Sequence, residues 1–194
     1  YHLIEGTYDH KMGIKEGGNL LISGGTGPMG LLAIDYALHG DIKPKNIVIT
    51  DVNEERLKRA SELYKTEGAV KVHYVNTAKI DDVVAHLKET AGGGYDDVFI
   101  FAPVPELVTQ GSKLLNPDGC LNFFAGPQNK DFSAEINFYD IHYNFTHYVG
   151  TSGGNTDDMR EAIKLIEDKK VNVAKVVTHV LGLDAVAETT LNQP

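Results

Sequence analysis

Short apolar runs alternate with longer helical patterns along most of the chain. The six runs are residues 19–23, 46–50, 72–75, 97–102, 120–125 and 146–151. The first five are rich in β-branched or aromatic residues and mostly continuous, which is typical of parallel strands covered on both faces. Helical patterns separate most of the runs or follow the last one, at residues 28–40, 53–68, 80–92, 105–119 and 156–170. The alternation predicts an α/β fold, a Rossmann-type doubly wound six-stranded parallel sheet of strand order 3-2-1-4-5-6.

Residues with cap preferences stand at several predicted helix ends. Asn53 precedes "EER" and is expected to cap the second helix, with Gly68 at its end. Thr156 is expected to cap the last helix, whose terminal lysines suit the helix dipole. The run "GGG" at 92–94 is explained as a C-cap and short loop, without ligand chemistry.

Composition and charge narrow the class of protein. The chain has 194 residues, 42% hydrophobic and 23% charged, as expected for a globular domain. A net charge of −9 argues against a nucleic-acid partner, although backbone amides could still bind a small anionic cofactor. The single cysteine excludes an internal disulfide framework and fits a reducing compartment, so we expect a cytoplasmic protein. No run approaches the roughly 20 apolar residues of a membrane span, and no membrane partner is expected.

The stretch "SGGTGPMG" at 23–30 concentrates glycines between the first strand and the first helix. In a dinucleotide-binding unit Gly25 would make the tight turn and Gly27 would admit a pyrophosphate to the backbone. Gly30 would let the helix pack closely on the strand. The amino end of the helix would then face the diphosphate.

Asp51 ends the second strand, 21 residues after Gly30. An acid there can accept hydrogen bonds from ribose hydroxyls and repel a 2′-phosphate, which favours NAD over NADP. Arg56 and Arg59 keep NADP possible, because an arginine near the ribose can accommodate that phosphate; Arg56 could instead lie against the ribose or adenine. The alternative is a glycine-rich turn in another α/β protein with Asp51 as an ordinary strand-end acid. The strand, the helix and the acid together favour the interpretation that this turn binds a dinucleotide.

The run "IKEGGNLLISGGTGPMGLLAIDYA" resembles the start of the cofactor domain of zinc-type, medium-chain alcohol and polyol dehydrogenases, including the proline of G-x-G-P-x-G. "TDVNEERLKRASEL", "YVGTSGGNTDDMREAIKLI" and "VVTHVLGLDAVAETT" are similar to later parts of that domain. The resemblance covers essentially all of 14–190 and looks closest to the sorbitol and L-sorbose 1-phosphate branch. It implies an inter-domain lead-in at 1–18, an NAD(P)-binding domain at 19–178 and a return segment at 179–194.

The resemblance also implies site residues. Those around the pyrophosphate would be Gly25, Thr26, Gly27, Pro28, Met29 and Gly30, and those at the ribose Asp51 and Arg56. Those lining the nicotinamide pocket would be Ala102, Pro103, Ala125, Gly126, Thr151 and Ser152. The catalytic zinc of this family is expected in a separate domain absent from this chain, so no catalytic or metal-binding residue is expected here. The implied substrate is a polyol or sugar, and a non-catalytic NAD-sensing module is the alternative.

Three further groups of residues have simpler interpretations. The aromatic stretch 131–145 is acidic, so it is interpreted as an excursion packed on the sheet or toward another domain rather than a base-stacking surface. Cys120 is expected to be a small buried hydrophobe. His142 and His147 could in principle bind zinc, but surface or packing roles are favoured.

The sixth run is expected to form a sheet edge without a lysine or proline to protect it. An edge covered by 131–145 is the alternative. The resemblance implies pairing of this edge across a two-fold axis, hence a homodimer or a higher oligomer.

Overall fold

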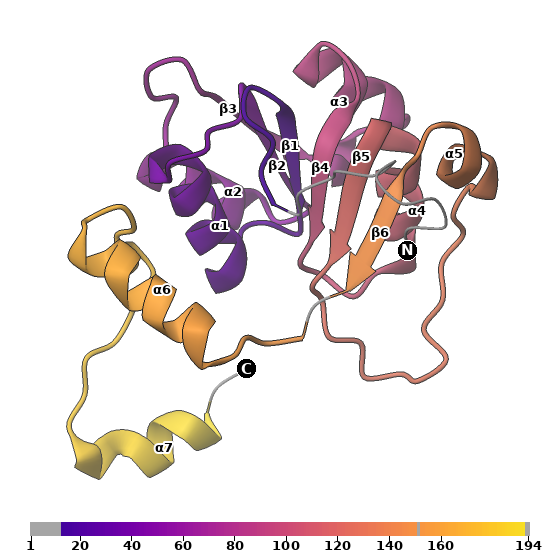
Figure 1. Cartoon of the computed structure of the whole chain (residues 1–194). Helices are drawn as coiled ribbons and strands as arrows, with labels where there is room; N and C mark the ends of the chain where they lie inside the picture. The colour runs from indigo at the N-terminus through magenta and orange to yellow at the C-terminus, as the bar shows by residue number, and fades with distance from the viewer. Residues whose placement is uncertain (1–12, 151, 193–194) are drawn as a thin grey trace.

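The computed structural model describes residues 13–150 and 152–192. The predicted sheet is confirmed: six parallel strands lie in the order β3-β2-β1-β4-β5-β6 (Figure 1). Their bounds are β1 Asn19–Ser23, β2 Asn46–Asp51, β3 Lys71–Asn76, β4 Tyr95–Ile100, β5 Leu115–Phe123 and β6 His147–Gly150. From β1 the chain adds strands toward one side of the sheet, and from β4 it adds them toward the other side. The carboxyl ends of β1 and β4, the two central strands, therefore flank the crevice where ligands of such sheets bind.

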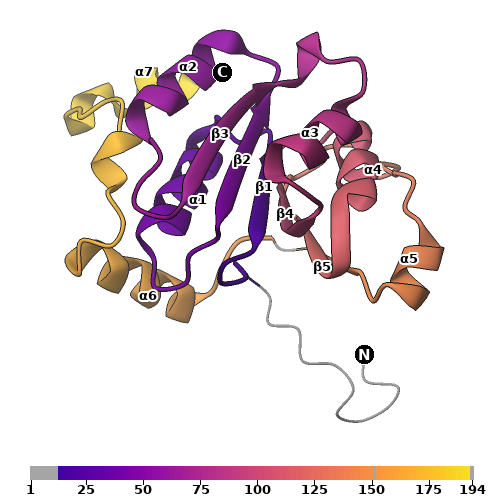
Figure 2. The same cartoon turned by 90° about the horizontal axis from the view of Figure 1, so that it is seen from above.

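Helices cover both faces of the sheet (Figure 2). On one face lie α1 Pro28–His39 and α2 Glu54–Leu63, and on the other α3 Val83–Ala91 and α4 Pro105–Leu114. The remaining helical elements are α5 Phe138–Tyr143, α6 Thr156–Glu167, α7 Val186–Leu191 and three short 3-10 turns, Thr77–Lys79, Val173–Lys175 and Leu183–Ala185. The fold is therefore a three-layer sandwich with α6 and α7 beyond it.

Successive residues of the central strands enter two separate cores, because side chains of a strand point alternately to opposite faces. Leu20 and Ile22 of β1 pack with Ile34 of α1, whereas Leu21 packs with Leu87 of α3 on the other face. All five side chains are at most 2% exposed. Burial on both faces explains why these strands are continuous apolar runs in the sequence.

The caps of α2 and α6 only partly follow the sequence prediction. Asn53 caps α2 as predicted, accepting a hydrogen bond from Arg56 N. The prediction that Gly68 ends this helix is wrong: α2 ends at Leu63, and Gly68 (φ +58°) lies in the turn before β3. The prediction of a Thr156 cap is also wrong by one residue, because Asn155 forms a capping box with Asp158. The Asn155 side chain accepts two backbone N–H groups, which satisfies donors at the helix start.

The predicted helix 105–119 is too long. The helix α4 ends at Leu114 and β5 begins at Leu115. Pro117 explains the early end, since proline removes a helix donor and disfavours helical backbone at the residue before it. Asp118 then adopts φ 62°, and its N–H donates to the Asn144 carbonyl at 2.7 Å.

Residues 170–172, which follow α6, contact α1 and the loop after it through polar groups. The N–H of Asn172 donates to the Asp35 carboxylate at 2.6 Å, and Lys170 Nζ pairs with Asp41. Asp35 is fully buried. By contrast, α6 keeps Met159 and Ile163 exposed. Within the described part of the chain, no helix is long and apolar enough to cross a membrane.

The amino ends of β1 and β4 are joined to the segment before β1 by two acids. Asp96 accepts hydrogen bonds from Lys15 Nζ and Asn19 N, and Asp97 accepts one from Lys15 N at 2.8 Å. Asp97 is only 2% exposed. Burial, opposed by the Lys15 N–H bond, raises the pKa of Asp97 from an ordinary 3.8 to about 6.

We expect Asp97→Asn to stabilise the protein more at pH 7.5 than at pH 4.5. The raised pKa means that the folded state holds this proton more tightly than the unfolded state. The cost of the buried charge is therefore absent below about pH 4, grows between about pH 4 and pH 6, and stays constant above that range. Urea unfolding at both pH values should show the variant's relative stability rising by about 1–3 kcal/mol. A pH-independent difference would contradict this account.

Candidate functional site

The turn after β1 brings the chain against the carboxyl ends of its neighbouring strands. Gly24 has φ +67°, and a Cβ there would lie 2.7 Å from Ala102 Cβ, at the residues that follow β4. The N–H of Gly25 donates to the Thr50 carbonyl of β2 at 3.1 Å. The residue of this turn with left-handed backbone is thus Gly24, directly before Gly25, to which the sequence analysis assigned the tight turn. Gly25 is required for a different reason, since its Cβ would lie 2.7 Å from Ile22 Cγ2.

Gly30 and Gly27 differ sharply in the space around them. A Cβ on Gly30 would lie 2.2 Å from the Gly25 carbonyl oxygen, so α1 packs directly against the turn. A Cβ on Gly27 would meet nothing within 4 Å. Gly27 is the N-cap of α1, with ordinary extended backbone (φ −75°). The structure therefore has open space at Gly27, where the sequence predicted room for a pyrophosphate.

The amino end of α1 has no internal acceptor for its free N–H groups. Gly27 has no side chain, Pro28 occupies the first turn, and the first turn has no acidic residue. Among the described helices only α1 lacks both a side-chain cap and a first-turn acid. The unsatisfied donors and the positive end of the helix dipole suit an anion.

Asp51 lies beside this turn and is held by three donors. Its Oδ1 accepts hydrogen bonds from the N–H groups of Val52 and Asn53 at 2.8 and 3.0 Å. Its Oδ2 accepts a hydrogen bond from the hydroxyl of Thr26, in the glycine-rich turn. Thr26 is 6% exposed, whereas Asp51 remains partly accessible. The acid that is predicted to bind a ribose thus accepts a hydrogen bond from the turn that is predicted to hold the phosphates.

Arg56 lies in the first turn of α2 and is exposed. Within the described residues its side chain makes no ion pair or hydrogen bond. It therefore remains a free cation on the Asp51 side of the turn.

The residues predicted for the nicotinamide pocket follow β4, β5 and β6. Ala102 contacts the Gly24 turn, and Pro103 is exposed. Ala125 is buried and donates its N–H to the Ile100 carbonyl, while Gly126 is exposed. Ser152 is exposed, and Thr151 lies outside the described residues. The carboxyl ends of β4 and β5 thus meet near the turn.

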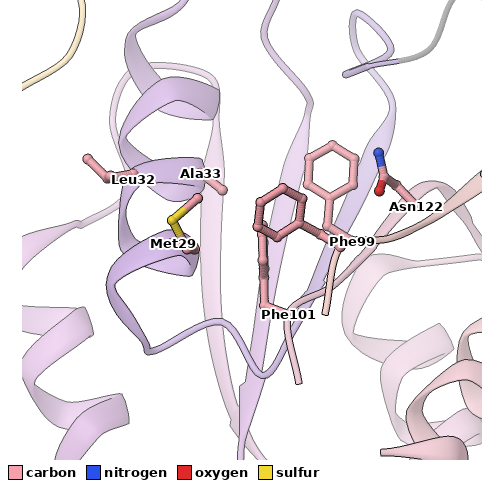
Figure 3. Close-up of a pocket in the computed structure, with 7 residues that line it drawn as sticks. Met29, Leu32, Ala33, Phe99, Phe101 and Asn122 are labelled. Atoms are coloured by element: carbon pink, nitrogen blue, oxygen red, sulfur yellow. The ribbon is translucent and has the colours of Figure 1, made fainter. Parts of the chain in front are cut away.

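An apolar hollow of about 310 Å³ lies between α1 and the sheet (Figure 3). Met29 and Ala33 line it from α1, and Phe99 and Phe101 line it from the β4 side. The other lining residues are Leu32, Asn122 and Phe124. Met29 is 49% exposed, so the hollow opens beside the first turn of α1. It can receive a flat, largely apolar ring.

The sequence prediction named only Met29 of these lining residues. Phe101 and Phe124 each directly precede a predicted pocket residue, Ala102 and Ala125. A signal was present, because Phe99 and Phe101 are two positions apart in the predicted run 97–102, where such residues would share a face. The sequence alone did not reveal that this face is left partly open beside α1.

The described residues contain no group of three or more His, Cys, Asp or Glu side chains able to hold a metal ion. His147 contacts Asp118 at 2.9 Å, and the His142 ring packs edge-on against Tyr143. Cys120 is buried, as predicted, and burial raises the pKa of its thiol to about 11. These residues do not fit a zinc site.

Comparison with known proteins agrees with this class of fold and site. A family model described as zinc-binding dehydrogenase matches residues 28–168. The chain is 59% identical over 196 residues to L-sorbose 1-phosphate reductase of Klebsiella pneumoniae. It is 48% identical over 198 residues to mannitol-1-phosphate 5-dehydrogenase of Aliivibrio fischeri. The fold and glycine-rich turn define a Rossmann-type domain, and the chain belongs to the zinc-binding dehydrogenase family.

The chain spans about half the length of these relatives: each alignment covers 100% of this chain and 47% of the relative. Among solved structures, 2R,3R-butanediol dehydrogenase of Bacillus subtilis matches with a TM-score of 0.74 at 28% identity. That match covers 91% of this chain and 47% of the other.

The two glycines flanking the start of α1 give a matched test of the packing. Gly30→Ala should destabilise the fold by about 1–3 kcal/mol, because its Cβ would overlap backbone atoms of Gly25 that cannot move independently. Gly27→Ala should change stability by less than about 0.5 kcal/mol, since its Cβ enters open space with compatible backbone. Equilibrium urea unfolding of both variants would measure the difference, and equal losses would contradict the packing observed here.

Proposed function

We propose that this chain is the NAD(H)-binding domain of an oxidoreductase. The observation that carries the proposal is the uncapped amino end of α1, with open space at Gly27 and an acid fixed beside it. The N–H groups of Met29 and Gly30 would hold the diphosphate, because they belong to the first turn of α1, where donors lack partners within the helix. Thr26 and Pro28 complete the turn around it.

Asp51 would accept a hydrogen bond from a ribose hydroxyl of the adenosine. Its negative charge would also repel a 2′-phosphate, so we propose that NAD is preferred to NADP. Arg56, exposed in the first turn of α2, is the residue that would weaken this preference, since its cation could pair with that phosphate.

The nicotinamide ring would occupy the apolar hollow or its mouth. This position follows from the hollow's opening beside Met29 and from its aromatic lining by Phe101 and Phe124. The backbone after β4 and β5, at Ala102, Pro103, Ala125 and Gly126, would border the ring, with Thr151 and Ser152 after β6. A dinucleotide would then run from the end of β2, across the amino end of α1, to the α1 face of β4 and β5.

We propose that the whole protein interconverts the alcohol and ketone forms of a polyol or sugar, sugar phosphates included. The names of the sugar-phosphate relatives and their 59% and 48% identity support this substrate class. When bound, the nicotinamide accepts or gives up the hydride of such a reaction. Zinc would be held outside the described residues, because these contain no suitable ligand group.

A second proposal concerns assembly through β6. This strand is at the sheet edge and pairs only with β5 among the described strands. Aromatic side chains of α5 next to it are exposed, with Phe138 at 73% and Phe145, which precedes β6, at 64%. Pairing of two β6 strands about a two-fold axis would continue the sheet and produce a homodimer or a larger assembly built from it.

Asp51→Ser is expected to weaken NADH binding about tenfold and to leave NADPH binding nearly unchanged. Serine retains an oxygen that can accept the Val52 and Asn53 N–H groups, so the turn keeps its shape. Fluorescence titration of the whole protein with each cofactor would measure the ratio. Glu55→Ser is the matched control, because it removes one exposed acid from the same helix start. If the ratio of NADH to NADPH affinity in Asp51→Ser equals that of the wild type, Asp51 does not contact the ribose.

Val149→Lys should shift the protein toward monomers, because it introduces two positive charges close to the proposed two-fold axis. Val149→Thr keeps a β-branched side chain of similar size and should associate like the wild type. Light scattering at tens of micromolar protein would compare the oligomeric mass of the wild type and the two variants. A monomeric wild type, or a lysine variant that associates normally, would contradict the proposed interface.

A further inference from the structure

Thr26 lies in the glycine-rich turn, and its side chain reaches the acid at the end of β2. Its hydroxyl donates to Asp51 Oδ2, although the two residues are 25 positions apart in the chain. Thr26 is 6% exposed and lies between Gly25 and Gly27. The hydrogen bond therefore connects the turn that faces the diphosphate with the acid at the end of β2.

The three donors on Asp51 fix both oxygens of its carboxylate. A carboxylate has about four acceptor positions. Two on Oδ1 are occupied by the N–H groups of Val52 and Asn53, and one on Oδ2 by Thr26. One acceptor position remains, on the oxygen that Thr26 holds. Without Thr26, the two backbone bonds would still hold Oδ1, but nothing on the described residues would hold Oδ2.

We propose that Thr26 is a positioning residue that sets the preference for NADH over NADPH by fixing Oδ2 of Asp51. This inference rests on the proposed function. A fixed Oδ2 presents its remaining acceptor position to a ribose hydroxyl at little entropic cost. It also keeps the negative charge in place against a 2′-phosphate. A carboxylate free to turn would bind ribose less well and could swing away from that phosphate.

The Thr26–Asp51 hydrogen bond would also couple the glycine-rich turn to the ribose site. Because Thr26 is adjacent to Gly27, any shift of the turn on diphosphate binding acts directly on the Asp51 carboxylate. Selectivity at the ribose would thus depend on a residue outside the ribose site.

The test compares Thr26→Val, which keeps the side-chain shape and removes the hydroxyl, with Thr26→Ser, which keeps the hydroxyl. Dissociation constants of NADH and NADPH are measured for the whole protein by fluorescence titration at one ionic strength. The valine variant should lose about tenfold in its preference for NADH, as expected for loss of a charge-assisted hydrogen bond. The serine variant should stay within about twofold of the wild type. If the valine variant does not fold, as judged by its melting curve, Thr26→Ala takes its place.

The ratio of the two constants separates positioning from a merely structural role. If the bond only braced the two loops, its loss would weaken both cofactors equally, and an unchanged ratio would overturn the inference. In an Asp51→Ser background the valine substitution should no longer change the ratio, as in a double-mutant cycle. A further change there would also overturn it. Failure of the wild type to bind NADH would instead refute the proposed function, and the inference with it.

Discussion

The contact between α1 and the turn after β1 is the constraint on which the site depends. There is no room for a side chain between Gly30 and the backbone of Gly25, where a Cβ would lie 2.2 Å from an oxygen. This contact fixes the helix axis relative to the turn, and therefore the direction of the free N–H groups at its amino end. A helix held further from the turn would have the same dipole aimed elsewhere. Close packing at Gly30 and open space at Gly27 are thus two parts of one arrangement.

Three helices with side-chain caps show what α1 lacks. The side chains of Asn53 and Asp82 each accept one backbone N–H at the starts of α2 and α3, and that of Asn155 accepts two at the start of α6. These caps satisfy donors locally and stabilise their helices by about 1 kcal/mol each. The start of α1 forgoes part of that stabilisation, because the glycine at its N-cap has no side chain to accept these donors. Such a local sacrifice of stability is expected at a functional site.

The sheet was predictable because its signal is repeated. Burial on both faces forces each central strand to be apolar throughout, and Leu20–Leu21–Ile22 shows this over three consecutive residues. Helix ends were less predictable, since they depend on a single residue with several competing neighbours. Asn155 took the cap expected of Thr156, and Pro117 ended a helix whose apolar pattern continues. The glycines of the turn were recognised by spacing, but spacing could not tell that the left-handed conformation belongs to Gly24.

The hollow and the Thr26–Asp51 bond were beyond reach of the sequence for a common reason. Both arise from elements distant in the chain: α1 meets β4 and β5 at the hollow, and the β1 turn meets the end of β2 at the bond. A pattern along one segment predicts its own conformation, whereas these features depend on how two segments approach. Strand order narrows that approach, since β1 lies between β2 and β4 and its turn must lie beside the ends of both. The parallel sheet thus gathers the phosphate, ribose and apolar parts of the proposed site at one edge, although each comes from a different loop.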